Sequence, residues 1–416
     1  MHNFFIENRK SLYSLLKNNS IVILFSGKAP HKSNDVYYDF EVNRNFYYLT
    51  GIQRENTIFM AFKANNKIQE LLFIEKNDPV LEKWIGKKIT AEEATKISGI
   101  ENIFDDDYFR IKLNSIINLI SNNIETIYFD LDKYAWDDTN SIGLNFSNEI
   151  QSNYPHLKIE NVYKLLVQLR SIKKTQEIEL IKKSIDITKD GIELIIKHAI
   201  PGIKECELEA YFDFTLKSKG VKHAFSTIAA SGKNATILHY VNNDRIISNN
   251  ELILFDLGAS IDNYCADISR TFPINGIFTQ KQKTIYNIVL SCMKIVISNM
   301  KPGVSMRDIN ILAKKILAKE CKKIGLISSL DEIDKYYYHS IGHPLGLDTH
   351  DVGDRDIILQ PGMIYTCEPG LYIEEESIGI RIEDDILITE NGNINLSDHI
   401  IKEVDEIETL FKEIHG

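Results

Sequence analysis

Cysteine is scarce in this sequence. Five are present, an odd number, and they are scattered at Cys206, Cys265, Cys292, Cys321 and Cys367 with no C-x-x-C pair. Neither a disulfide framework nor a thiolate zinc site is therefore predicted. A reducing cytoplasm is the expected location.

Long apolar runs are missing too. Nothing approaches eighteen consecutive apolar residues, so no membrane span is expected. The first nineteen residues, MHNFFIENRKSLYSLLKNN, are interrupted by Glu7, Arg9 and Lys10, which argues against a signal peptide.

Positive charge is in deficit. Lys and Arg number 48 against 59 Asp and Glu, which leaves a net charge of -11. Such a field repels nucleic acid, and the basic SIKK cluster at residues 171–174 is typical of solvated helix charges. A nucleic-acid partner is not expected. The 44% hydrophobic and 26% charged content is that of a globular protein, and 416 residues predict two domains.

Residues 1–170 alternate short apolar runs with helical stretches. Buried strands are predicted at residues 21–27, 56–62, 70–75 and 126–131. Residues 89–100 predict a short helix in which Thr90 is the N-cap and Glu93 completes a capping box. This pattern favours an α/β N-terminal domain.

Residues 171–416 have a different pattern. Apolar side chains at three- and four-residue spacing over residues 169–202 predict one long amphipathic helix ending near Ile200. Two more helices are predicted at residues 280–300 and 305–324, and strands at residues 250–260, 264–272, 363–373 and 379–389. Long helices beside alternating strands favour an α+β C-terminal domain.

Carboxylates interrupt these strands. If Asp262 and Asn263 form a two-residue hairpin turn, residues whose numbers sum to 525 face each other. Asp256 then opposes Ser269, and Asp267 lies diagonally within reach of Asp256 on the same face. Two such carboxylates repel unless a proton or a cation lies between them. The alternative is that one caps the turn and the other is exposed.

Two glutamates add to this set. Alternation along residues 379–389 places Ile380, Ile382 and Asp384 on one face and Arg381, Glu383 and Asp385 on the other. Glu368 lies where the strand of residues 363–373 breaks at Pro369-Gly370. A single buried glutamate is usually a paired structural charge, but four carboxylates on apolar strands are hard to satisfy without cations.

A histidine-rich stretch supplies nitrogen. HSIGHPLGLDTHDVGDRD, residues 339–356, holds three of the eleven histidines, and His343 lies between glycines that allow close backbone approach. One imidazole with four carboxylates suits Mn²⁺, with Co²⁺ or Zn²⁺ as alternatives. Five ligands exceed one tetrahedral zinc site, so two ions are predicted.

These motifs together resemble the pita-bread (creatinase/aminopeptidase) metallopeptidases, and most closely the aminopeptidase P branch, the Xaa-Pro aminopeptidases. The resemblance covers nearly the whole chain. It is carried by residues 256–273, 339–353, 361–373 and 379–389, by the segment ATILHY that contains His239, and by residues 35–51 of an N-terminal domain of the aminopeptidase P type.

The resemblance implies a set of site residues. The metal ligands would be Asp256, Asp267, His343, Glu368 and Glu383. His239, His339 and His350 would line the substrate site, and Arg381 and Tyr372 would join its polar network. Asp35 matches an acidic residue that reaches a neighbouring subunit's site in related oligomers, although its flanking residues depart from the pattern. For each histidine, the alternative is an ordinary loop or core hydrogen bond.

The implied activity is release of the N-terminal residue from peptides with proline in the second position, by attack of a hydroxide that bridges two metal ions. Glu368 would transfer the proton, His339 would stabilise the oxyanion, and His350 and His239 would hold the substrate. The alternatives are a prolidase, which cuts Xaa-Pro dipeptides, and a non-catalytic pita-bread binding protein.

A homodimer or homotetramer is expected, with residues 1–170 shaping the substrate channel and the subunit contact. Trp84 is a contact candidate or, alternatively, a core residue.

Overall fold

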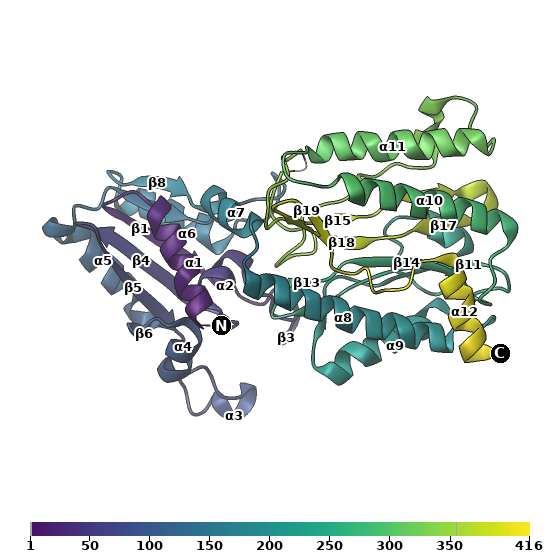
Figure 1. The fold of residues 1–416 in the computed structure, drawn as a ribbon. Helices are drawn as coiled ribbons and strands as arrows, with labels where there is room; N and C mark the ends of the chain where they lie inside the picture. Colours follow the sequence, from purple (N-terminus) through teal and green to yellow (C-terminus); the bar gives the residue numbers. More distant parts are fainter. Residues whose placement is uncertain (1, 355) are drawn as a thin grey trace. The chain divides into compact units, whose positions relative to one another are not determined.

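The computed structural model describes residues 2–354 and 356–416, and Arg355 of the histidine-rich motif lies outside the described residues. The chain forms two compact units, residues 1–170 and residues 171–416 (Figure 1). Among the helices described, none combines the length and the apolar character needed to cross a lipid bilayer.

The first unit is built on a six-stranded mixed sheet of order β6-β5-β4-β1-β7-β8, in which β1 runs antiparallel to β4 and parallel to β7. Its elements are α1 (His2–Leu15), β1 (Ser20–Phe25), β2 (His31–Ser33), β3 (Val36–Tyr37), α2 (Arg44–Thr50), β4 (Ile58–Ala64), β5 (Lys67–Ile74), α3 (Glu82–Ile85), α4 (Ala91–Ser98), β6 (Ile103–Asp105), η1 (Asp106–Tyr108), α5 (Phe109–Asn118), η2 (Ile120–Asn122), β7 (Thr126–Phe129), α6 (Ile142–Asn153), β8 (Lys158–Asn161) and α7 (Tyr163–Ser171).

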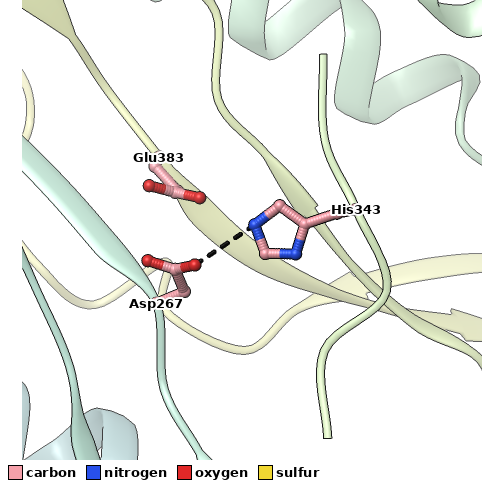
Figure 2. A group of neighbouring side chains, drawn as sticks. All are labelled: Asp267, His343 and Glu383. Carbon is pink, nitrogen blue, oxygen red and sulfur yellow. Dashed lines mark ion pairs between the residues drawn. The ribbon is translucent and has the colours of Figure 1, made fainter. Parts of the chain in front are cut away.

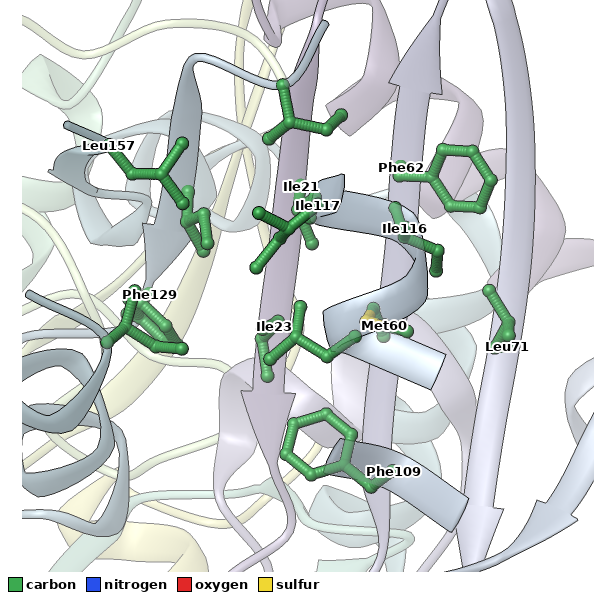
Figure 3. Close-up of a cluster of buried hydrophobic side chains, with 14 of the residues drawn as sticks. Ile21, Ile23, Met60, Phe62, Leu71, Phe109, Ile116, Ile117, Phe129 and Leu157 are labelled. Carbon is green, nitrogen blue, oxygen red and sulfur yellow. The ribbon is translucent and has the colours of Figure 1, made fainter. Parts of the chain in front are cut away.

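Both faces of this sheet are covered by helices. On one face, side chains of β1, β4, β5 and β7 pack against α5 and α6 in the apolar core drawn in Figure 3. On the other face, Arg9 of α1 is fully buried and donates to Glu70 of β5. The four predicted strands and the α4 helix are confirmed, and Thr90 and Glu93 form the predicted capping box. The unit is an α/β fold, as the alternation predicted.

The second unit places its strands between two pairs of long helices. Helices α8 and α9 pack on one side, and α10 and α11 on the other (Figure 1). Its elements are α8 (Thr175–His198), α9 (Glu205–Lys219), β9 (Lys222–His223), β10 (Ile228–Ser231), η3 (Gly232–Thr236), β11 (Leu252–Leu257), β12 (Ala259–Ile261), β13 (Tyr264–Cys265), β14 (Ile268–Pro273), α10 (Gln280–Asn299), α11 (Met306–Lys323), η4 (Leu330–Lys335), β15 (Ile364–Cys367), β16 (Gly370–Ile373), η5 (Glu374–Glu376), β17 (Ile378–Arg381), β18 (Asp384–Thr389), β19 (Gly392–Asn395) and α12 (Val404–His415).

The prediction of one continuous helix over residues 169–200 is wrong. Helix α7 ends at Ser171 and α8 begins at Thr175. Between them, the backbone N–H of Lys173 donates to Gly362 O at 2.8 Å instead of to the preceding turn. The apolar spacing continues through the interruption, so periodicity alone does not reveal it.

The long predicted strands are each interrupted once. Residues 250–260 form β11 and β12, residues 264–272 fall in β13 and β14, and residues 363–373 form β15 and β16 around Pro369. The prediction that residues 379–389 form one strand is wrong, because β17 pairs with β16 whereas β18 pairs with β15 and β19. The chain changes sheets at Ile382 and Glu383.

Candidate metal centre

The first carboxylates are positioned by a hairpin with the predicted register. Asp256 pairs with Ser269 between β11 and β14, and Ile261 pairs with Tyr264 beyond the interruption. Asp262 and Asn263 both adopt left-handed backbone conformations, with φ of 50° and 68°. This is the two-residue turn geometry that matches the twist of the flanking strands. The turn therefore fixes the register that brings Asp267 towards the site.

The remaining acidic side chains come from the strand interruptions and their neighbours. Glu368 lies between β15 and β16, and Glu383 lies between β17 and β18. The Glu383 N–H donates to Ser269 O at 3.1 Å, which ties the second interruption to the hairpin. His343 is held by two bonds with one residue of β15, because Thr366 N donates to His343 O and His343 N donates to Thr366 Oγ1.

Three of these side chains converge on one point. Asp267, His343 and Glu383 each present a ligand atom, and the three atoms lie within 4.8 Å of one another (Figure 2). His343 Nε2 is 3.3 Å from Asp267 Oδ2 and 3.5 Å from Glu368 Oε1. Glu368 therefore borders the same group, on the histidine side.

Burial and mutual repulsion shape the charge of this cluster. Burial raises the pKa of Asp267 well above its usual value, and the neighbouring Asp256 and Asp385 carboxylates raise it further. Burial also raises the pKa of Glu383, with Asp267 and Glu368 adding to the effect. The group therefore holds protons unless a cation neutralises it.

Asp256 joins the cluster through a hydroxyl and a guanidinium. Ser269 Oγ lies 3.0 Å from Asp256 Oδ1 and 2.8 Å from Glu383 Oε2, within donating distance of both. Arg381 donates to Ser269 Oγ through Nε at 2.8 Å and to Asp256 Oδ2 through Nη2 at 2.7 Å. The buried Arg381 thus compensates part of the negative charge and fixes the Asp256 carboxylate.

A hydrogen-bonded chain leads from Arg381 to His339. Arg381 Nη1 donates to the Tyr372 hydroxyl at 3.1 Å, and this hydroxyl lies 2.8 Å from His339 Nε2. His339 Nδ1 is 2.8 Å from Ser340 O, which can only accept, so Nδ1 carries a proton. Burial lowers the pKa of His339, and the charge of Arg381 also acts in that direction. In the neutral ring, Nε2 is then the acceptor for the Tyr372 proton.

The other predicted substrate residues lie at different depths. The His350 ring is 4.1 Å from the His343 ring, centroid to centroid, and partial burial lowers its pKa. His239 is exposed beyond η3, and its charge lowers the pKa of His350 in turn. Asp35 is an exposed residue between β2 and β3 of the first unit.

Three residues of the site were not singled out from sequence. Ser269 links two carboxylates, Thr366 donates to Glu368 Oε1 at 3.2 Å, and Asp385 accepts from the backbone N–H of Asp267 at 3.2 Å. The register rule already placed Ser269 opposite Asp256, so its role was within reach of that argument. Thr366 lies two residues before Glu368, so strand alternation already places these two side chains on one face. Asp385 of β18 contacts a residue beside β14 in another sheet, and alternation carries no signal for that contact.

The arrangement fits a divalent cation. Glu383 Oε1 is buried without a hydrogen-bond partner among the described residues, and it belongs to the three-residue group at ligand distance. Carboxylate oxygens with one imidazole form the donor set that Mn²⁺, Co²⁺ and Zn²⁺ accept. A buried acidic group of this kind is costly without a positive partner.

The chain is similar to known proteins over nearly its whole length. Residues 179–390 match metallopeptidase family M24, and residues 5–128 match the aminopeptidase P N-terminal domain. The Xaa-Pro aminopeptidase of Haemophilus influenzae is 33% identical, covering 98% of this chain and 96% of that protein.

Two solved structures show the same fold along the chain. A Bacillus anthracis protein provisionally named aminopeptidase P is 53% identical, with a TM-score of 0.96 over 99% of this chain and 98% of that one. Aminopeptidase P from Escherichia coli, solved with the inhibitor Pro-Leu, is 29% identical, with a TM-score of 0.91 over 100% of this chain and 99% of that one. The second unit is thus the pita-bread fold of these peptidases, and the chain belongs to metallopeptidase family M24.

Proposed function

We propose that this chain is an Xaa-Pro aminopeptidase, a metal-dependent exopeptidase that releases the N-terminal residue from peptides with proline second. The observation that carries the proposal is the convergence of Asp267, His343 and Glu383 within 4.8 Å, with a buried Glu383 oxygen that lacks a hydrogen-bond partner among the described residues. The full-length likeness to Xaa-Pro aminopeptidases supports the choice of substrate.

Five residues would hold two divalent ions: Asp256, Asp267, His343, Glu368 and Glu383. Manganese is the proposed metal, with cobalt or zinc as alternatives, because the donor set is rich in hard oxygens. When bound, the ions supply Lewis-acid polarisation of the scissile carbonyl and lower the pKa of a nucleophilic water towards neutrality. The E. coli relative has also been solved with zinc substituted and product bound.

Glu368 is the proposed proton carrier. Its Oε1 accepts from Thr366 Oγ1 at 3.2 Å, which holds the carboxylate on one side, and its Oε2 lies 3.8 Å from His339 Nδ1 on the other. The nitrogen of an Xaa-Pro bond carries no hydrogen, so the leaving proline needs a proton delivered to it. A carboxylate fixed at the edge of the cluster can take a proton from water and donate it there.

The histidines would bind and polarise the substrate. His339 Nδ1–H, which donates to Ser340 O and lies 3.8 Å from Glu368 Oε2, is the donor assigned to the developing negative oxygen. For Nδ1–H to donate to the substrate oxygen, its hydrogen bond to Ser340 O must lengthen. His350 and the exposed His239 are assigned to the peptide backbone and the proline ring, and Arg381 and Tyr372 hold the network in place.

Product analysis tests the substrate class. Purified protein, with Mn²⁺ added or removed by chelator, would be offered a matched panel of Xaa-Pro-Yaa tripeptides, Xaa-Pro dipeptides and tripeptides with alanine second. The expected result is metal-dependent release of the first residue from the tripeptides with proline second. Cleavage confined to dipeptides would identify a prolidase instead, and no cleavage of any peptide would leave the non-catalytic alternative.

Measuring the metal bound to purified protein tests the proposed ligand set. Asp267→Asn is expected to lose bound metal, whereas Asp405→Asn, which removes the same charge from an exposed side chain, keeps it. Equal metal content in the two variants would contradict the proposed ligand set.

A homodimer or homotetramer is also proposed, with residues 1–170 contributing the subunit contact. The Trp84 side chain is 84% exposed on α3, so the alternative of a core tryptophan is wrong. Its exposure supports a contact role, and Asp35, also exposed, is the proposed residue that reaches a neighbouring subunit's site. Light scattering of Trp84→Ser against the original protein tests the contact.

A further inference from the structure

The connection between α7 and α8 contains a buried ion pair. Lys173 Nζ lies 3.0 Å from Asp351 Oδ2, and the two side chains are 2% and 1% exposed. The desolvation cost of such a pair offsets most of its attraction, so a buried ion pair is poor evidence for stabilisation. An apolar pair of similar size would fill the same space at lower cost, so these charges need another explanation.

Asp351 belongs to the loop that carries the site histidines. Apart from isolated bridges, the described residues from 336 to 363 form no helix or strand, although His339, His343 and His350 all lie there. Asp351 directly follows His350, and its N–H donates to Pro344 O at 2.9 Å. Residues 344–351 therefore form a closed turn whose two ends carry the neighbouring histidine rings.

The ion pair fits tightly into this turn. A Cβ at Gly346 would lie 2.1 Å from Asp351 Oδ2 and 2.9 Å from Lys173 Cε, so only glycine leaves room for the pair. Gly346 O also accepts from Cys265 N at 2.9 Å, which connects the turn to the strand leading to Asp267. The turn is thereby tied to the hairpin and to the start of α8.

Lys173 holds the loop at a second place. Its backbone N–H donates to Gly362 O, just before β15, while its side chain reaches Asp351. The interruption between α7 and α8 frees this N–H from the helix and points the ammonium at the loop. One residue thus fixes both the histidine end and the strand end of the loop.

We propose that Lys173 and Asp351 are positioning residues that fix the exposed His350 ring against His343. The expected effect on kinetics rests on the function proposed above, in which His350 contacts the substrate. The His350 ring is exposed and lies on a loop without regular structure, and misplacement of a binding group by about 1 Å can cost on the order of 100-fold in rate. The ion pair adds a buried side-chain contact directly next to this ring, where the loop turns.

Three variants and one combination of them test the kinetic part. Both side chains of the pair are buried and charged, so the test variant replaces them together, Lys173→Met with Asp351→Asn. Its matched control is Lys189→Met with Glu193→Gln, which makes the same type of change in a more exposed pair on α8. The third variant is His350→Ala, alone and combined with the test variant.

The expected result is a fall of about tenfold to 100-fold in kcat/KM for a tripeptide with proline second, with metal content retained. This loss should vanish when His350 is already alanine, because nothing remains to be positioned. A test variant with full kcat/KM, or one whose loss persists unchanged in the His350→Ala background, would overturn the proposal. The Lys189 and Glu193 control should match the original protein.

A spectroscopic measurement keeps the inference separate from the proposed activity. In protein labelled at the histidine ring carbons, the test variant should shift or broaden the NMR signal of His350 and leave that of His198, which stacks on Tyr211, unchanged. An unmoved His350 signal would overturn the positioning role even if no peptide is cleaved. If the signal moves and the original protein cleaves nothing, the proposed function fails and the positioning inference stands.

Discussion

Ser269 has a single hydroxyl proton and two carboxylates within donating distance of it. Its Oγ lies 3.0 Å from Asp256 Oδ1 and 2.8 Å from Glu383 Oε2, while it accepts from Arg381 Nε. The hydroxyl can satisfy only one of the two carboxylates at a time. Arg381 Nη2 also donates to Asp256 Oδ2, so Asp256 has a positive partner of its own. When Ser269 donates to Asp256, Glu383 must carry its own proton or face a cation, which is consistent with its raised pKa.

Tyr372→Phe tests the chain from Arg381 to His339. The hydroxyl accepts from Arg381 and donates to His339 Nε2, so its loss frees the ring to change tautomer or rotate. We expect kcat to fall about tenfold to 100-fold, the range found when partners behind a functional group are removed, with metal content unchanged. Tyr286→Phe is the control, because that buried hydroxyl donates to Lys402 O. Equal kcat in the two variants would contradict the assignment.

Glu177 gives the second unit a pH dependence of its own. Burial raises the pKa of this carboxyl to about 7, although Lys174 N and the Tyr264 hydroxyl both donate to it. Because the folded state holds the proton more tightly than the unfolded chain, the stability that Glu177 contributes is fully present below pH 4.5 and is lost as pH rises through about 7. The loss is on the order of 3 kcal/mol.

Glu177→Gln, which mimics the protonated side chain, should therefore flatten the free energy of unfolding between pH 5 and 8. Glu179→Gln, two residues further along and exposed, should leave the slope as it is. Denaturant unfolding at several pH values measures both. A slope that survives in Glu177→Gln would assign the effect to other groups.

At the scale of elements, three of the five candidate ligands lie at interruptions in strands. Asp267 precedes β14, Glu368 separates β15 from β16, and Glu383 separates β17 from β18. An interrupted strand releases its side chains from strict alternation, so carboxylates from different sheets can meet. This is why the cluster forms here and not along an uninterrupted face.

The sequence predicted some of these elements and could not predict others. The Asp262–Asn263 turn sets the hairpin register by local chemistry, so pairing Asp256 with Ser269 needed no tertiary information. No turn residue such as proline or glycine marks the change of sheet at Ile382 and Glu383, because the reason for it lies in partners more than a hundred residues away, such as Ser269 O, which accepts from Glu383 N. The α7–α8 interruption at Lys173 is set by Gly362 and Asp351 in the same way.

Gly258→Ala tests the interruption between β11 and β12. A Cβ at this position would lie 1.9 Å from the backbone oxygen of Ala266, so the hairpin would have to open beside Asp267. We expect a loss of at least 1–3 kcal/mol in the free energy of unfolding, together with weaker metal binding. Gly392→Ala is the matched control, since nothing lies within 4 Å of its Cβ. Denaturant titration and metal analysis would compare the two. Equal stability would show that the strands tolerate the methyl group.

At the scale of the whole molecule, the buried carboxylates of the site destabilise the second unit when they are ionised and no cation is bound. Arg381 partly compensates the cluster, but burial still raises the pKa of Asp267, Glu383 and Asp385 well above their usual values. The metal-free protein therefore holds protons that the unfolded chain releases as pH rises above about 4 to 5. Stability contributed by these groups is present at low pH and is lost as pH rises.

Metal removal should expose this dependence. With chelator present, Tm should be lower at pH 8 than at pH 6, whereas added Mn²⁺ should raise Tm by more at pH 8, because the ligands bind metal in their deprotonated form. Calorimetric titration in two buffers of different ionisation enthalpy should show proton release on metal binding.

Glu383→Gln is the internal control, because it removes one carboxyl whose pKa is raised. Its metal-free form should therefore lose less stability between pH 6 and 8, and it should gain little from Mn²⁺. If metal binding releases no protons, or if Mn²⁺ stabilises the original protein and Glu383→Gln equally, the buried carboxylates are not the groups that the cation neutralises.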